Sequence, residues 1–157
     1  SYSNTPTTFT SFLSTISSRM GIYGFILLFY IFFPVAVSKW SLGHFFSARY
    51  FLGILAAFTM VVPTFTALMQ DDAKRLMTWH AIGQGGYMLL GIAIGTPMAL
   101  AGGIFHILNH GTYILLIFMA IGAVEMRTGE TNLNKLGGLI KRMPVSFLAI
   151  LFGIIGL

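Results

Sequence analysis

The sequence predicts an all-α protein, a polytopic transmembrane bundle of about five helices. Of its 157 residues, 56% are hydrophobic and only 8% are charged, whereas soluble domains carry about 25% charged residues. The mean hydropathy is +0.84, and the apolar residues collect in long runs with the basic residues mostly at their ends, as in membrane-spanning helices. Nucleic-acid binding is therefore not expected from the net charge of +5.

Five apolar runs give the expected helices, and no linker or repeat divides the chain into more than one domain, residues 1–157. The first four are long enough to cross about 30 Å of hydrocarbon, but the last is shorter than the roughly 20 residues that a span needs. We therefore expect a fragment of a larger membrane fold. The runs are residues 6–34, 50–69, 76–95, 97–124 and 144–157.

The connections between the runs predict the orientation in the membrane. Six basic residues fall in or beside two of the connections, residues 70–75 and 125–143, and two fall on the opposite side. The positive-inside rule then places these two connections on the cytoplasmic side of the membrane. Within the second connection, Leu133, Leu136 and Ile140 share one face of an ideal helix, which predicts a short amphipathic helix lying along the membrane.

The absence of cysteine excludes iron–sulfur ligation, thiolate metal sites and disulfides within these residues. Any redox centre then belongs to a partner subunit, and we expect no cofactor, no metal and no catalysis by this chain itself.

Arg19 is the most unusual polar residue of the apolar runs. It lies about 20 Å along the first run at 1.5 Å per residue, too deep to reach the cytoplasmic surface easily. An ionisable side chain at such a depth indicates an ion pathway by default. The alternative is that Arg19 has only a structural role. It would then bind groups on neighbouring helices, or its side chain would reach the outer membrane surface because the helix is tilted.

On residues 76–95, His80, Gln84 and Tyr87 share one helical face. His80 is expected near the cytoplasmic end. It is either a proton-entry relay or a hydrated interfacial histidine.

On residues 97–124, His106 and His110 are four residues apart, and Asn109 and Tyr113 extend their stripe toward a single neighbour. His110 is expected near mid-membrane, where a histidine pKa near 6.5 suits proton transfer. The alternative is a hydrogen-bonded structural histidine.

The sequence gives weaker support to two other kinds of site, a zinc-dependent hydrolase site and a haem site. The His106 and His110 pair resembles half of a zinc-protease motif, but the required glutamate is absent because position 107 is Ile. A haem held between His80 and a histidine of residues 97–124 is a better rival, although the expected difference in depth between His80 and His110 argues against it.

Four stretches in order resemble the antiporter-like subunits shared by respiratory complex I, Mrp-type Na⁺/H⁺ antiporters and membrane-bound group 4 hydrogenases with their sulfur-reducing relatives. They correspond to that family's eighth to twelfth helices and span nearly the whole chain. The stretches are "SNTPTTFTSFLSTISSRMGIYGF", "QDDAKRLMTWHAIGQGGYMLLGIAIGTPMAL", "AGGIFHILNHGTYILLIFMAIGAV" and "TNLNKLGGLIKRMP".

The resemblance implies H⁺ or Na⁺ movement through a line of polar residues at mid-membrane, driven by partner membrane subunits. By position, Arg19 occupies the family's relay lysine and His110 its eleventh-helix histidine. Asp72, Lys74 and Arg75 match a cytoplasmic "DxKR" motif that anchors helix ends.

Two departures leave the function open between alternatives. Arg19 replaces a lysine with a group that does not release its proton, and Ile114 stands where many members carry a lysine. The leading hypothesis is an ion-translocating subunit of a multisubunit redox-driven or Mrp-type complex, most similar to the group 4 hydrogenase and sulfur-reductase branch. The alternatives are a translocation-inactive structural paralogue beside active subunits and a haem-binding helix bundle.

Overall fold

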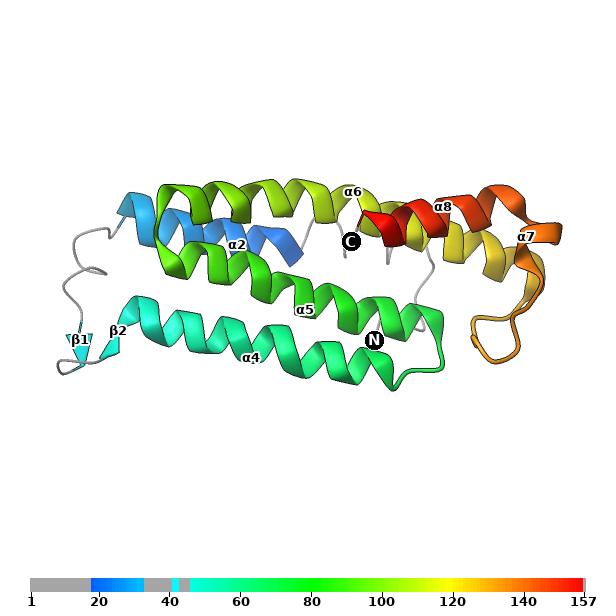
Figure 1. Cartoon of the computed structure of the whole chain (residues 1–157), viewed down its shortest axis with the longest axis horizontal. Coiled ribbons are helices and arrows are strands. Elements are labelled where there is room, and N and C mark those ends of the chain that lie inside the picture. The colour runs from blue at the N-terminus through cyan, green and yellow to red at the C-terminus, as the bar shows by residue number, and fades with distance from the viewer. Residues whose placement is uncertain (1–17, 33–40, 43–45, 157) are drawn as a thin grey trace.

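The computed structural model describes residues 18–32, 41–42 and 46–156, and its long helices lie side by side in one bundle (Figure 1). Long apolar runs with capped ends account for these helices. The elements are α2 (Ser18–Ile26), the π-helix η3 (Leu27–Phe32), strands β1 (Ser41–Leu42) and β2 (Phe46–Ser47), and helices α4 (Ala48–Leu68), α5 (Ala73–Ile94), α6 (Pro97–Thr128), α7 (Leu139–Arg142) and α8 (Pro144–Ile155).

Helix α5 is central, because it packs against α2, α4 and α6, while α8 packs against α6. Helices α4 and α5 form an antiparallel hairpin whose seam is very close at Gly86. A Cβ atom on Gly86 would lie only 2.7 Å from the backbone nitrogen of Met60 and 2.8 Å from the carbonyl oxygen of Ala56. Only glycine therefore lets the two backbones approach this closely.

The turn between α5 and α6 is tight. Gly95 ends α5 with φ of 76°, in the left-handed region that favours glycine. Thr96 then caps α6 by accepting a hydrogen bond of 3.2 Å from the backbone N–H of Ala99, and Pro97 occupies the first helical position. The two helices consequently run antiparallel from a single sharp point.

Two apolar clusters pack along the bundle, one toward each end. The cluster nearer the α5–α6 turn includes Met88 and Ile92, and the other includes Met77, Ile117 and Phe118. Polar side chains of α5 and α6 lie between the two clusters in the sequence of both helices. Polar groups are thus held midway along the bundle, between two apolar layers.

The two connections with the most basic residues meet at the end opposite the α5–α6 turn (Figure 1). Asp72 and Asn132 form an antiparallel bridge. The backbone N–H of Ala73 donates to Thr131 at 3.0 Å, and that of Leu133 donates to Asp71 at 2.8 Å. Both connections therefore lie on the same side, as the charge pattern predicts.

The predicted all-α bundle is confirmed, and four of its expected helices correspond to α4, α5, α6 and α8. Within the described part of the chain, α4 and α6 are long and apolar enough to cross a membrane. Residues 6–17 and 33–34 of the first expected helix lie outside the described residues.

Two expectations about the connection after α6 are wrong. Helix α6 continues to Thr128 and is ended by Gly129, which has φ of 69°, so Glu125 is helical rather than part of a loop. The amphipathic helix through Leu133, Leu136 and Ile140 is not formed. Its first two residues lie in turn and irregular structure, and only α7 is helical.

Candidate functional site

Three helices bring the four predicted relay residues together in what we call the basic cluster: Arg19 from α2, His80 from α5, and His106 and His110 from α6. The ring centroids of His80 and His110 are 6.3 Å apart, and those of His106 and His110 are 6.0 Å apart. The His110 side chain is almost fully enclosed, with 2% of its surface exposed. The four predicted relay residues therefore lie together in the structure.

The hairpin explains which residues meet. His80 lies fifteen residues before Gly95 and His110 fifteen residues after it, while Gln84 and His106 lie eleven residues before and after. In an antiparallel helical hairpin, residues equally far from the turn in sequence lie at the same height along the hairpin axis. The expectation that His80 is peripheral and His110 central is therefore wrong.

This shared level removes the depth argument against haem ligation. The haem hypothesis stays a prediction, and a Soret absorption band from the purified full-length protein would identify such a haem.

Arg19 contacts His110 directly, with its Nη2 atom against Nδ1 of the imidazole. Because a guanidinium only donates hydrogen bonds, Nδ1 must be the acceptor. His110 is then a neutral imidazole whose proton is on Nε2. Arg19 thus supplies a positive charge and selects one tautomer of its neighbour.

His106 is held in a similar way from α5. Its Nε2 atom lies 2.8 Å from Oε1 of Gln84, so the ring nitrogen donates and the amide oxygen accepts. The Tyr87 ring lies beside it, with 6.0 Å between the centroids. Gln84 and Tyr87, both predicted as supporting residues, therefore contact the basic cluster from one face of α5.

Several buried polar atoms of the cluster have no hydrogen-bond partner among the described residues: Nε2 of His80, Nε2 of His110 and the hydroxyl of Tyr113. The Tyr113 ring packs edge-on against His110, with centroids 5.0 Å apart. A cavity of about 200 Å³ adjoins the cluster and is lined by Arg19, His110 and Thr59. A cavity of this size has room for water molecules, which can satisfy buried donors and carry protons between them.

Asn109 does not face the basic cluster with the rest of the predicted stripe, and Ile114 of the same helix packs in an apolar cluster. Asn109 donates from Nδ2 to the carbonyl oxygen of Gly156 at 3.2 Å, so it faces the end of α8 rather than the basic cluster. Ile114 is fully buried, at 0% exposure, within the apolar cluster that contains Met77 and Phe118. The position where many family members carry a lysine is here filled by apolar packing.

The predicted loop anchors lie at the start of α5, where Asp72 is the cap and Lys74 and Arg75 are in the first helical turn rather than in the expected loop. Asp72 caps this helix, accepting from the backbone N–H of Arg75 at 3.0 Å, and also accepts from the hydroxyl of Thr131. Lys74 is 3% exposed and forms an ion pair of 2.6 Å with Glu125 of α6. The Arg75 side chain is exposed to solvent.

Sequence reasoning missed Glu125 as the partner of Lys74, because the charge pattern places Glu125 in a loop. The left-handed Gly129 is the helix stop signal that could have placed it on α6. Among the residues that the structure describes, no group of three or more His, Cys, Asp or Glu side chains is arranged to hold a metal ion.

The family model described as "NADH:quinone oxidoreductase/Mrp antiporter, TM" matches residues 1–157. The chain belongs to this family. It is therefore a membrane protein with an antiporter-like fold, and the resemblance carried by the four sequence stretches is confirmed.

Similar proteins come from different complexes of this family. The chain is 42% identical over 91 residues to a Na⁺/H⁺ antiporter subunit of Alkalihalophilus pseudofirmus, covering 58% of the chain and 18% of that protein. It is 31% identical over 155 residues to formate hydrogenlyase subunit 3 of Escherichia coli, covering 92% of the chain and 24% of that protein.

A solved structure is also similar. The membrane-bound sulfane sulfur reductase, an archaeal respiratory membrane complex, contains a chain that is 31% identical, with a TM-score of 0.84 over 97% of this chain and 30% of that one. The chain thus spans between about a fifth and a third of the length of these family members.

Proposed function

We propose that the chain is part of an ion-translocating subunit that moves H⁺, Na⁺ or both within a multisubunit membrane complex. The observation that carries this proposal is the basic cluster. His110 lies within 6.0 to 6.3 Å of two further imidazoles, midway along two antiparallel helices and beside a cavity large enough for water. Imidazoles in such a row can take up a proton and pass it on.

In this mechanism His80, His106 and His110 transfer protons, and Arg19 positions His110. The contact between Arg19 and Nδ1 of His110 opens, Nδ1 takes up a proton from water, and the resulting imidazolium releases the proton on its unpartnered Nε2 to water, which returns His110 to its neutral form. The guanidinium cannot release its own proton, so its fixed charge repels a further proton on His110 and favours its onward transfer. Water in the adjoining cavity completes the path between rings that do not touch.

The parent complex we favour is of the group 4 hydrogenase and sulfur-reductase branch. The short connections and the stretch "TGETNLNKLGGLIKRMP" favour this branch, and similarity to the formate hydrogenlyase subunit and to the sulfur reductase is compatible with it. The partners are then other membrane subunits, including further antiporter-like ones, in a prokaryotic cell membrane. The loop end carrying Lys74 and Arg75 faces the cytoplasm.

The test measures ion uptake with the full-length protein in its complex, in sealed membrane vesicles, using a pH-sensitive dye for H⁺ and ²²Na⁺ for sodium. We expect His110→Ala to lower uptake about 100-fold, because a positioned proton-transfer group contributes about 10²- to 10⁴-fold. Thr112→Val is the matched control. Thr112 lies on the same helix, and its hydroxyl bonds only to the Asn109 carbonyl oxygen among the described residues. Equal uptake in the His110 variant and the wild type would overturn the relay.

The second candidate is a structural paralogue that packs beside active subunits without moving ions. It is favoured by Ile114, whose complete burial leaves an apolar core where many relatives carry a lysine. Under this alternative, His110→Ala changes the yield of assembled complex but not the uptake per assembled complex. Quantifying the complex by immunoblot in the same vesicles separates the two.

A further inference from the structure

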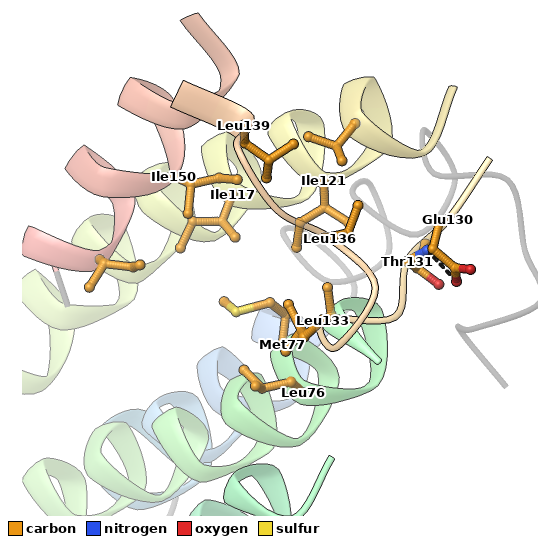
Figure 2. A pocket seen from close by; sticks show the side chains of 13 residues that line it. Leu76, Met77, Ile117, Ile121, Glu130, Thr131, Leu133, Leu136, Leu139 and Ile150 are labelled. Carbon is orange, nitrogen blue, oxygen red and sulfur yellow. Dashed lines mark hydrogen bonds between the residues drawn. The ribbon is translucent and has the colours of Figure 1, made fainter. Parts of the chain in front are cut away.

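An apolar cavity of about 300 Å³ lies at the loop end of the bundle, between α5, α6 and α8 (Figure 2). Ligand pockets in proteins measure about 300 to 1,000 Å³, so the cavity is large enough for part of a small amphipathic molecule. Figure 2 shows side chains of the connection after α6 lying opposite those of the helices. Much of the wall is formed by Met77, Ile117, Ile121, Leu133, Leu136 and Ile150.

A second, polar hollow of about 640 Å³ adjoins this cavity, because Glu130, Leu136 and Leu139 line both. Four cations line the polar hollow: Arg127, Lys135, Lys141 and Arg142. Together the two hollows form one site with an apolar half and a basic half, which we call the amphipathic hollow.

The charges of the basic half are poorly balanced within the described part of the chain. Glu130 is the one described carboxylate in the lining, and it pairs with Lys135 at 3.2 Å. The backbone N–H of Asn132 and the Lys135 ammonium hold the pKa of Glu130 below its usual value, so Glu130 is charged at neutral pH. Arg127, Lys141 and Arg142 form no ion pair with a described carboxylate.

We propose that the amphipathic hollow binds an anionic phospholipid, with its phosphate at Arg127, Lys141 and Arg142 and an acyl chain in the apolar cavity. Three cations complement an anionic headgroup, and they stand beside the start of α8 and the end of α6, where apolar helices meet the headgroup layer. A free phosphate ion would leave the apolar half without a role. The site does not depend on the basic cluster or on ion translocation.

The test uses the full-length protein in its complex, purified in detergent, stripped of lipid, and titrated with phosphatidylglycerol or phosphatidylcholine while bound lipid is counted by native mass spectrometry. We expect tighter binding of phosphatidylglycerol. The triple variant Arg127→Gln, Lys141→Gln, Arg142→Gln should lose about 100-fold in affinity for it, from about fivefold per cation near an anionic lipid. Binding of phosphatidylcholine should not change.

Arg75→Gln is the matched control, because Arg75 is an exposed cation at the same end of the bundle but lines neither hollow. It should keep the wild-type affinity for phosphatidylglycerol.

A second variant, Leu136→Phe, enlarges a side chain that lines both hollows. It should lower the affinity for both lipids, because it reduces the space for the acyl chain. Equal affinity for the two lipids, displacement by excess inorganic phosphate, or unchanged binding in the triple variant would each overturn the proposal. The last outcome would indicate that another protein segment covers the site.

Discussion

At the scale of single residues, Arg19 determines which proton His110 can exchange. Its guanidinium occupies Nδ1 of the imidazole, so the exchangeable proton is on Nε2, which has no partner among the described residues. A proton can enter at Nδ1 only when this contact opens, and the proton on Nε2 then leaves. Replacement of the family lysine by arginine therefore does not remove the relay we propose, but it moves the exchange step from position 19 to the histidine.

We predict that Arg19→Lys keeps ion uptake at the wild-type level or above, since lysine retains a donor and a charge and can also release a proton. Arg19→Met should lower uptake about tenfold or more, because a buried acceptor left without its donor costs about 1 to 3 kcal/mol. Uptake is measured in vesicles and normalised to assembled complex. Wild-type uptake in the methionine variant would contradict the positioning role.

The composition of the cluster was predictable residue by residue, but its contacts were not. Depth and position in the family motifs single out Arg19 and His110 in the sequence, and helical spacing groups His80 with Gln84. That Arg19 touches His110 depends on how α2 lies against α6, which no local pattern encodes. The pairing of Gln84 with His106 could have been found by counting residues outward from Gly95.

At the scale of helices, close backbone approach sets the hairpin geometry. We predict that Gly86→Ala destabilises the full-length protein by about 1 to 3 kcal/mol, the usual cost of overpacking, because the new Cβ would meet the backbone of α4. Gly102→Ala is the matched control on α6, where nothing lies within 4 Å of the added Cβ. It should be neutral or stabilising by up to about 1 kcal/mol, the difference in helix propensity.

Thermal unfolding of the purified full-length protein in detergent, followed by circular dichroism, measures both variants. A Gly86 variant as stable as the Gly102 variant would mean that α4 moves away from α5 without cost.

Helix positions followed from the sequence wherever capping and hydrophobicity agreed. The pattern predicts a helix over residues 50–69, and α4 covers Ala48–Leu68, because an apolar run coincides with a serine cap. The end of α6 was misplaced because charged residues of its last turn resemble a loop, and only the glycine that follows ends the helix. The connection beyond it follows hydrogen bonds to the α4–α5 loop, a tertiary effect that helical periodicity cannot reveal.

At the scale of the whole molecule, the two polar connections lie at the same end of the bundle. The proposed orientation in the membrane can therefore be tested by labelling the two ends of α6. Met98 and Met126 are 87% and 85% exposed near opposite ends of α6. In a cysteine-free full-length background, we predict that Met126→Cys reacts with a membrane-impermeant maleimide only from the cytoplasmic side, and Met98→Cys only from the opposite side. The reverse pattern would invert the orientation inferred from the basic residues.

Helices α5 and α6 are paired from Gly95 outward. The number of residues between Gly95 and each polar residue, which is the length of each arm of the hairpin, therefore determines which side chains meet. One residue added between Gln84 and the turn would shift everything before it by about 1.5 Å and rotate it by about 100°. His80 and Gln84 would then lose their partners on α6 together. The length of these arms is consequently part of the site, and insertions of the kind that surface loops absorb easily are excluded from this hairpin.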